Sequence, residues 1–398
     1  MINKNAAYIE PNDYFPEETR KKYKIGEYVE SEESKQIKAV MLGHAVGDAL
    51  GVPVEGWSRE ELDKSPVTDM QGWGSYPVPE GCWSDDTSMA LATLDSLKKG
   101  GIDYEEIMQN FAAWCTDDKY TPTGELFDIG KTCLNAILVY MNDKNPALKC
   151  GFDDEHSNGN GSLMRIHPMA LYLYSKGMAD DDGMEIIHNT SELTHAHPRA
   201  KIACGIYAMV LWELLKNPCK LSIVNGINKA RDYYKVKVKE KEKKEIKDML
   251  NLSELSDREQ NELVKMLWSG DEEKSYKSFT KEFKIYDNML VKRICLEYFN
   301  RGNINNNLIP RDEIKSSGYV VDTLIAAIWC ILTTNDYKSC VLKAVNLGRD
   351  TDTVAGVAGG LAGALYGIDS IPEKWLNTIK RKDYIEEMCE EASAVWYK

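Results

Sequence analysis

Apolar residues recur at the spacing of an α-helix along much of this chain, and that periodicity limits the folds open to it. Residues three or four apart share one helix face, so a run of this kind predicts a helix with a buried side. Alternation of apolar and polar residues, the pattern of a half-buried strand, is scarce. The sequence therefore predicts an all-α fold. The clearest runs are Met89-Leu91-Leu94-Leu97, Ile202-Ile206-Met209-Val210-Leu214 and Val321-Leu324-Ile325-Ile328-Leu332.

Two of the expected helices are rich in small residues. Gly43, Gly47 and Gly51 are spaced by four in GHAVGDALG, which places them on one helix face. Glycines recur again in VAGVAGGLAGALYG, at 354–367. A glycine inside a helix costs about 1 kcal/mol relative to alanine, so this many glycines need a reason. Close approach of helices in a dense core is the simplest one, and we expect both stretches to surround the acidic segments described below.

Changes in polarity divide the chain into segments. Residues 1–35 are polar and charged, and we interpret them as an N-terminal extension that precedes a domain at 36–398. Within that domain, KVKVKEKEKKEIK at 235–247 opens a polar region that ends at about 283. It is highly charged and its helical periodicity is weak, which is typical of a solvated helix pair or of an excursion from the core. We therefore expect an insertion-like region at about 235–283.

Composition excludes some classes of protein and compartment. The net charge of −14 disfavours nonspecific binding to nucleic acid or to an anionic membrane. The 10 cysteines include no Cys-x-x-Cys pair, so neither a thiol zinc site nor a redox pair is expected. No signal-peptide pattern is visible at the N-terminus. We expect a cytoplasmic protein with reduced thiols.

Two acidic segments stand immediately before expected helices. The first is Trp83-Ser84-Asp85-Asp86-Thr87, and the second is Gly348-Arg349-Asp350-Thr351-Asp352-Thr353. Helix capping explains one aspartate at such a position better than two with flanking hydroxyls. Asp350 and Asp352 would point about 200° apart in a regular helix. They converge only if the chain turns there, and Gly348 permits such a turn.

Taken together, these segments offer carboxylate and hydroxyl oxygens. Magnesium, manganese and calcium prefer such ligands, whereas zinc would need a histidine or cysteine nearby. Two divalent ions about 3.5–4 Å apart can share a bridging aspartate and jointly hold a water or a pair of hydroxyls. Each segment taken alone also fits an ordinary helix cap, so the residues alone leave both interpretations open.

Two further polar stretches are candidates for ligand binding. SNGNGSLMR at 157–165 has glycines that let backbone N–H groups line an anion, with Ser162 and Arg165 as further donors. The other is Thr194-His195-Ala196-His197-Pro198, where two histidines two apart suit a strand or a loop. A surface turn and a capping or core histidine are the ordinary alternatives for the two stretches.

The order and content of these motifs resemble the ADP-ribosylglycohydrolase family. That family includes the dinitrogenase-reductase-activating glycohydrolase and the ADP-ribosyl-acceptor hydrolases. The resemblance covers roughly residues 36–380, and any one motif is weak, whereas seven in family order are specific. The matching pieces are GHAVGDALGVPVEG (43–56), WSDDTSMAL (83–91), TGELFDIGKT (123–132), GNGSLMR (159–165), LTHAHP (193–198), SSGYVVDTLIAAIW (316–329) and NLGRDTDTVAGVAGGLAGALYG (346–367).

The resemblance implies a compact orthogonal bundle of α-helices around two divalent cations, Mg²⁺ or Mn²⁺. Serine stands at position 84, where relatives often have threonine, and it keeps the hydroxyl. Arg349 stands where a small or acidic residue is common, and we expect it to project into solvent. The ligand set that the resemblance implies is Ser84, Asp85, Asp86, Asp350, Asp352 and Thr353.

The resemblance also implies roles for residues outside the metal ligands. Glu55 matches the family's mobile glutamate, and Asp128 matches an aspartate that acts on the ribose. Together with Asp86 they form the expected catalytic set, although the residues do not say which of Glu55 and Asp128 is the acid or the base. The loop expected to hold the pyrophosphate and distal ribose contains Asn160, Gly161 and Ser162, and His195 is expected near the ligand.

The expected activity is hydrolysis of the bond between ADP-ribose and an acceptor at C1 of the ribose. Arginine-type protein modification is the favoured acceptor, and a serine, an acetyl ester or a modified nucleic-acid base is not excluded. A monomer with no membrane partner is expected. Two alternatives stay open, namely a catalytically silent ADP-ribose-binding or structural protein of this fold, and a metal phosphohydrolase that attacks the pyrophosphate.

Overall fold

The computed structural model describes residues 30–237, 282–286, 290 and 309–398. The prediction of an all-α fold is confirmed, because these residues form helices and no β-strand beyond two isolated bridges, Phe152–His195 and Gly159–Tyr319. The longer helices are α2 (Glu32–Gly51), α3 (Arg59–Lys64), α4 (Asp85–Leu97), α5 (Tyr104–Asp117), α6 (Lys131–Asp143), α7 (His167–Ser175), α8 (Asp181–Glu192), α9 (Pro198–Lys216), α10 (Lys220–Asp232), α15 (Val320–Leu332), α16 (Tyr337–Val345), α17 (Thr351–Tyr366), α18 (Glu373–Thr378) and α19 (Lys382–Trp396). Shorter turns of helix are Val52–Val54, Ala147–Lys149, Tyr233–Lys237, Arg311–Glu313 and Ile368–Ser370.

Helix α2 is the central element of the bundle. Every residue from Ile37 to Gly51 is buried, as is typical of a helix that is covered on all sides. Of the described helices, it alone is long and apolar enough to cross a bilayer, and its apolar window is 100% buried inside the protein. Its start is fixed by Ser31, whose side chain accepts a hydrogen bond from the Ser34 amide at 3.1 Å.

The glycine-rich helices α2 and α17 pack against each other in opposite directions. A Cβ atom at Gly43 would lie 2.6 Å from the Gly359 carbonyl oxygen, and one at Gly47 would clash with the Ala355 carbonyl. The prediction that these glycines permit close helix approach is confirmed. Because the pairing is antiparallel, the end of α2 at Gly51 meets the start of α17 at Asp352. This crossing brings the motif at 43–56 next to the second acidic segment.

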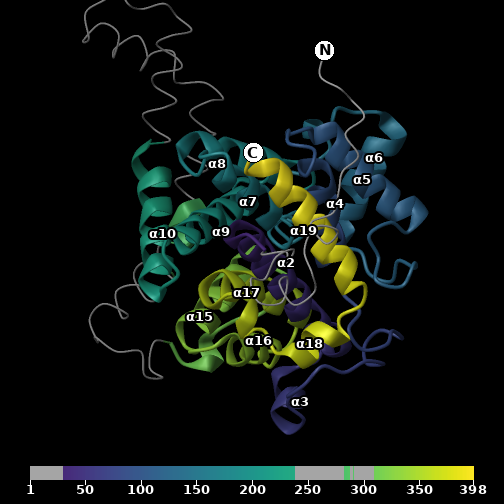
Figure 1. Cartoon of the computed structure of the whole chain (residues 1–398), viewed down its shortest axis with the longest axis vertical. Helices are drawn as coiled ribbons and strands as arrows, with labels where there is room; N and C mark the ends of the chain where they lie inside the picture. Colours follow the sequence, from purple (N-terminus) through teal and green to yellow (C-terminus); the bar gives the residue numbers. More distant parts are fainter. Residues whose placement is uncertain (1–29, 238–281, 287–289, 291–308) are drawn as a thin grey trace, which may run out of the picture.

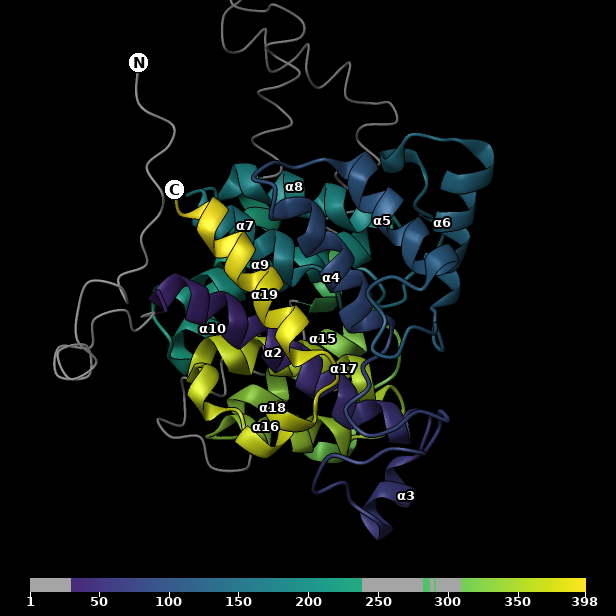
Figure 2. The same cartoon turned by 45° about the vertical axis from the view of Figure 1, so that its right-hand side comes forward.

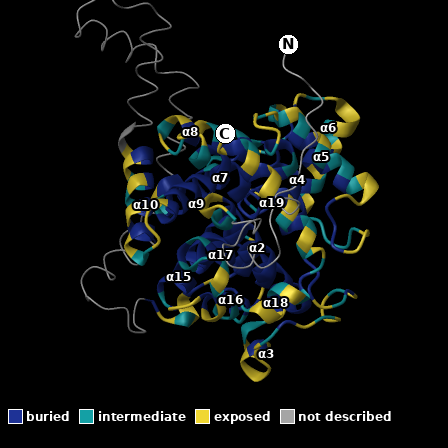
Figure 3. Ribbon diagram, viewed as in Figure 1, coloured by how far each residue is buried: buried dark blue, intermediate teal, exposed yellow. Residues whose placement is uncertain are grey.

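The remaining helices surround this pair in layers. In Figure 1, α7 and α9 lie above the pair and α16 lies below it, while α10 and α6 lie on opposite sides of the molecule. Figure 2 shows the same bundle with α15 next to α17. Figure 3 shows that the exposed residues gather on the outer faces of α3, α10 and the loops near α18. Helix α3 projects from the body in both ribbon views.

Only the edges of the expected N-terminal extension and of the expected insertion fall within the described residues. Helix α2 begins at Glu32, four residues before the expected domain start, and residues 1–29 lie outside the described part. Most of the expected insertion at about 235–283 also lies outside it. The described edges of that region are the helical turn Tyr233–Lys237 and the helical residues 282–286.

Candidate active site

An acidic cavity of about 230 Å³ lies at the starts of α4 and α17. It is lined by carboxylates from segments far apart in the sequence, and by glycines and polar groups of the loops at 128–133, 159–161 and 318. The carboxylates are Glu55, Asp85, Asp86, Asp128, Asp350 and Asp352. The structure therefore brings both predicted acidic segments to one cavity, together with Glu55 and Asp128.

The first acidic segment is held by the start of α4. Ser84 is the N-cap of this helix, and its hydroxyl accepts a hydrogen bond from the Asp86 amide at 3.3 Å. Asp85 accepts a hydrogen bond from the Gly130 amide at 2.9 Å. One buried oxygen of Asp86, Oδ2, has no protein partner. Burial raises the pKa of both Asp85 and Asp86 well above the usual value, and neighbouring carboxylates raise it further.

A carboxylate that the sequence patterns did not single out lies beneath this segment. Asp48 of α2 accepts hydrogen bonds from the Ser84 and Thr87 amides at 2.9 and 3.1 Å and from the Thr87 hydroxyl at 2.6 Å. It is fully buried, and burial raises its pKa to about 7. Asp48 thus fixes the start of α4 from the neighbouring helix. The only signal in the sequence was an aspartate inside an otherwise apolar helix.

The backbone of the second acidic segment makes the turn that Asp350 and Asp352 need in order to point into the same cavity. Gly348 and Arg349 have φ angles of 81° and 68°, and α17 begins only at Thr351. Asp350 therefore lies outside the helix and Asp352 inside it. The side chain of Arg349 is exposed, as expected. The Thr351 hydroxyl donates to the Gly51 carbonyl at 2.7 Å, which attaches the turn to the end of α2.

Hydrogen bonds and a group of close carboxylates join the two acidic segments and the neighbouring loops. The Thr353 hydroxyl donates to Asp86 Oδ1 at 3.3 Å. Oxygens of Glu55, Asp350 and Asp352 all lie within 4.8 Å of one another. The Asn160 amide group donates to Asp350 Oδ2 at 2.6 Å and to the Thr323 hydroxyl at 2.9 Å.

Glu55 and Asp128 occupy another side of the cavity. The Tyr76 hydroxyl donates to Glu55 Oε2 at 2.6 Å. Burial raises the pKa of Glu55 to about 7, and the charges of Asp128 and Asp350 contribute to the shift. The pKa of Asp128 is also raised, chiefly by burial. Carboxyl groups with pKa values moved toward neutrality are suited to transferring protons at physiological pH.

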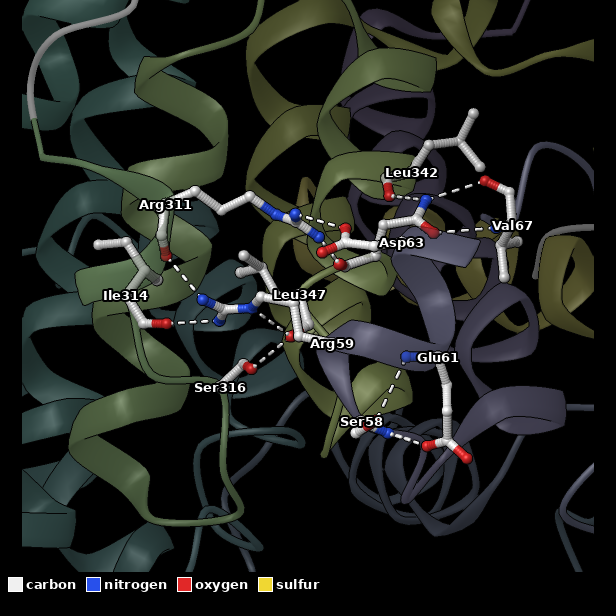
Figure 4. Close-up of polar contacts among 11 residues, drawn as sticks. Ser58, Arg59, Glu61, Asp63, Val67, Arg311, Ile314, Ser316, Leu342 and Leu347 are labelled. Carbon is white, nitrogen blue, oxygen red and sulfur yellow. Dashed lines mark hydrogen bonds and ion pairs between the residues drawn. The ribbon is translucent and has the colours of Figure 1, made fainter. Parts of the chain in front are cut away.

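An arginine-centred network fixes the segment that carries Glu55 (Figure 4). Arg59 donates to the carbonyls of Leu347 and Arg311 at 3.0 and 2.8 Å and to that of Ile314 at 2.5 Å. The backbone adds two reciprocal bonds, from the Gly56 amide to the Arg349 carbonyl and from the Arg349 amide to the Trp57 carbonyl, both at 2.7 Å. The segment after Glu55 is therefore attached directly to the chain that leads into Asp350.

The predicted anion loop lies against the same cavity, but its residues differ in orientation. Asn160 and Gly161 line the cavity. The Ser162 side chain is fully buried and bonds instead to the Ser191 hydroxyl at 2.8 Å. Arg165 is fully buried as well and donates to Thr194 Oγ1 at 2.8 Å, so its guanidinium is not free to bind an anion in the cavity.

His195 lines the cavity next to these glycines. Its Nδ1 is 2.9 Å from the Thr194 hydroxyl, and a Cβ atom at Gly161 would lie 2.9 Å from its Cε1. Burial lowers the pKa of His195 to about 3, and the charge of Arg165 contributes. The imidazole is therefore neutral at physiological pH and offers hydrogen bonds to a ligand without a positive charge.

The chemistry of the cavity fits divalent cations of the hard class. Its donors are carboxylate and hydroxyl oxygens, and Asp86 has a buried oxygen without a partner. Burial raises the pKa values of Asp85, Asp86 and Asp352, and repulsion among the carboxylates raises them further. Cations would remove that repulsion, so the residues present fit such a group.

Comparison with known proteins gives consistent relatives over nearly the whole chain. The family model described as ADP-ribosylglycohydrolase matches residues 30–398. An ADP-ribosylarginine hydrolase, Tri1, of Serratia proteamaculans is 30% identical over 366 residues, covering 91% of this chain and 80% of that protein. The ADP-ribosyl-[dinitrogen reductase] glycohydrolase of Rhodospirillum rubrum is 28% identical over 344 residues, covering 86% of this chain and 89% of that protein.

A solved structure supports the fold. It is titled an ADP-ribosylglycohydrolase-related protein complex and superposes with a TM-score of 0.64 at 24% identity, covering 92% of this chain and 99% of that one. At that identity the likeness bears on the arrangement of the helices and not on the chemistry.

Proposed function

Because the chain belongs to the ADP-ribosylglycohydrolase family, we propose that it hydrolyses the C1 bond between ADP-ribose and an ADP-ribosylated acceptor, with protein arginine as the favoured acceptor. The convergence of Asp85–Asp86, Asp350–Asp352 and Glu55 on one cavity carries this proposal. The likeness to an ADP-ribosylarginine hydrolase supports the choice of acceptor. A small-molecule conjugate of ADP-ribose fits the same cavity chemistry.

The proposed cofactor is a pair of divalent cations, Mg²⁺ or Mn²⁺. The residues that would hold them lie at the starts of α4 and α17, and all of them except the N-cap residue Ser84 line the cavity. When bound, such cations act as Lewis acids that orient sugar hydroxyls and acidify water. The proposed ligands are Ser84, Asp85, Asp86, Asp350, Asp352 and Thr353.

The chain's own groups then supply proton transfer and charge. Cleavage at C1 develops positive character on the ribose, which carboxylates in the cavity stabilise. In the chain without cations, burial raises the pKa of Glu55 to about 7, and a carboxyl of this kind can give or take a proton. Tyr76 donates to Glu55 and holds its carboxyl in place. Asp128 is the second candidate for the same exchange.

The distal part of the ligand is assigned to the loop at 159–162 and to His195. Asn160 is already oriented by Asp350 and Thr323, and its own backbone amide donates to the Gly318 carbonyl at 3.1 Å. The backbone amides of the glycines on both sides of it are the proposed donors to phosphate oxygens. Ser162 is fully buried and does not line the cavity, and its hydroxyl is bonded to Ser191, so its proposed part is to hold the loop in place. The neutral His195 adds a hydrogen bond at the same end of the cavity.

The proposal is tested by measuring release of free ADP-ribose from ADP-ribosylarginine. We expect release with Mg²⁺ or Mn²⁺, none after chelation, and none from Asp352→Ala, whose far-UV circular dichroism should stay helical. Full release in excess chelator would rule out the proposed cations. Binding of ADP-ribose without any release would indicate the silent member of the fold, and release of AMP would indicate a phosphohydrolase.

We also propose that the protein is a cytoplasmic monomer, with residues 1–35 as an extension and about 235–283 as an insertion in one domain. The cysteines of the described part are free thiols, which supports a reducing compartment. Light scattering coupled to size exclusion measures the mass, and a dimer would contradict the proposal.

A further inference from the structure

The two exposed tryptophans of the described chain belong to backbone segments that are hydrogen-bonded to each other. Trp57 is 37% exposed and Trp73 is 72% exposed. The other tryptophans of the described part are buried, namely Trp83, Trp114, Trp212, Trp329, Trp375 and Trp396. An indole gains by burial in a core or in an interface, so two that remain exposed together require an explanation.

Both exposed tryptophans lie on segments that are bonded to Glu55. Trp57 follows Glu55 by two residues, and its carbonyl accepts from the Arg349 amide at 2.7 Å. The loop of Trp73 is attached through Ser75, whose amide donates to the Pro53 carbonyl at 2.8 Å and whose hydroxyl donates to the Glu55 carbonyl at 2.7 Å. The backbone segments that carry the two indoles are therefore attached to the segment that carries Glu55.

The backbone at Trp73 adds a second observation. Its φ is 60°, in the left-handed region that bulky residues rarely adopt. The turn is fixed by the Trp73 amide, which donates to the Val78 carbonyl at 2.8 Å. An exposed side chain recovers nothing from burial that would offset this strain. Strained residues of this kind cluster at sites that bind ligands or partners.

The charges around these indoles indicate what they bind. Glu60, Glu61 and Glu80 are exposed on the same two segments. Two exposed cations lie close enough to interact with them, Arg349 with Glu61 and Lys374 with Glu80, which leaves Glu60 as the carboxylate without such a neighbour among these three. The guanidinium of Arg59 is occupied by three backbone carbonyls (Figure 4), so it presents little positive charge outward. Aromatic faces bordered by carboxylates suit a planar cation, and an arginine guanidinium stacks on indole.

We propose that Trp57 and Trp73 bind a basic acceptor polypeptide around its ADP-ribosylated arginine. This inference rests on the proposed function and adds a site for the acceptor outside the cavity that holds ADP-ribose. The Arg59 network holds the Glu55 segment rigid, so Trp57 is presented in a fixed position. The guanidinium of the acceptor then lies next to Glu55 while the ribose enters the cavity.

The test compares two substrates of the full chain with Mg²⁺ present. One is a lysine- and arginine-rich peptide with a single ADP-ribosylated arginine, and the other is ADP-ribosylarginine as the free amino acid. The measured quantity is the ratio of kcat/KM for the peptide to kcat/KM for the amino acid. We expect Trp73→Ala and Trp57→Ala each to lower this ratio about three- to tenfold, chiefly through KM of the peptide.

Two matched variants separate binding from a general loss of an exposed apolar group. Trp73→Phe keeps an aromatic face and should restore most of the ratio. Leu221→Ala removes a side chain that is 45% exposed on α10 and should leave the ratio unchanged. A ratio that Trp73→Ala and Trp57→Ala leave unchanged would overturn the proposal, as would equal losses on both substrates.

A stability measurement distinguishes a binding role from a structural one. Asparagine tolerates positive φ better than tryptophan, so Trp73→Asn should keep or raise the melting temperature while it lowers the ratio. A lower melting temperature together with equal losses on both substrates would make Trp73 structural. If the unchanged chain cleaves neither substrate with Mg²⁺ present, the proposed function fails first, which is a different outcome from an unchanged ratio.

Discussion

Glu55 and Asp128 show how much of the proposed chemistry depends on single side chains. Both line the cavity, both have raised pKa values, and Tyr76 donates to the first. Neither belongs to the two acidic segments that would hold cations. Glu55 lies within 4.8 Å of Asp350 and Asp352 and could itself hold a cation, so a substitution at Asp128 is the one that tests proton transfer separately from cation binding.

We predict that Asp128→Asn slows turnover far more than it weakens ligand binding. Asparagine keeps the shape of the side chain but cannot exchange a proton, and loss of a general acid or base costs about 10²–10⁴ in kcat. ADP-ribose affinity, measured by calorimetry with Mg²⁺ present, should change less than about threefold. Glu125→Gln is the matched control, because Glu125 is exposed on the same loop. An Asp128→Asn variant that loses affinity with kcat intact would contradict the role.

At the residue scale, the sequence predicts site carboxylates that are close together along the chain and misses those that stand alone. Asp85, Asp86, Asp350 and Asp352 are visible as adjacent or alternating carboxylates at helix starts. Asp48 has no such neighbour, and its partners at 84 and 87 are more than 35 residues away. An isolated aspartate in a helix is compatible with many environments. Only packing of α2 against α4 shows which one it has.

At the scale of elements, the crossing of α2 and α17 positions one acidic segment. The helices approach so closely that glycine Cα atoms meet the opposite backbone. The end of α2 then leads to Glu55, and the start of α17 carries Asp352. Any side chain placed in this crossing must separate the two helices, and with them the groups that line the cavity.

We predict that Gly47→Ala destabilises the fold by about 3 kcal/mol or more, at the upper end of overpacking effects. A Cβ at this position would clash with the Ala355 carbonyl, which is backbone and cannot move alone. Urea denaturation gives the free energy of unfolding. Gly101→Ala is the control, because a Cβ there meets nothing within 4 Å. If both variants are equally stable, the close packing of these helices is wrong.

The helices themselves were predictable from the sequence, whereas the long-range contacts that hold them together were not. The three periodic runs fall within α4, α9 and α15, and the glycine stretches within α2 and α17. Helical periodicity and small residues are local signals, so a single sequence carries them. The network of Arg59 joins carbonyls more than 250 residues away, and nothing near Arg59 in the sequence indicates those partners.

At the scale of the whole molecule, the acidic cavity makes stability depend on pH and on cations. The net charge is −14, and several carboxylates are gathered in one buried place. Without cations, folding raises the pKa of Glu55 from 4.5 to about 7 and that of Asp48 from 3.8 to about 7. The folded chain then binds more protons than the unfolded chain between those values. The contribution of Glu55 and Asp48 to the free energy of unfolding is therefore greatest below their pKa values in the unfolded chain. That contribution is lost as the pH rises through about 7.

We therefore predict that Mg²⁺ raises the melting temperature more at about pH 8 than at about pH 5.5, because cations must displace protons from these carboxylates at the lower pH. The chelated protein should melt several degrees lower at the higher pH. Differential scanning fluorimetry at both pH values, with and without Mg²⁺, measures both effects.

Asp352→Asn is the control variant. It changes the overall charge by one unit and removes a carboxylate of the cavity, so its response to Mg²⁺ should be much smaller at either pH. General repulsion on an acidic surface would persist in that variant, whereas repulsion inside the cavity would not. An equal shift at both pH values, or a full response from Asp352→Asn, would mean that Mg²⁺ acts elsewhere on the molecule.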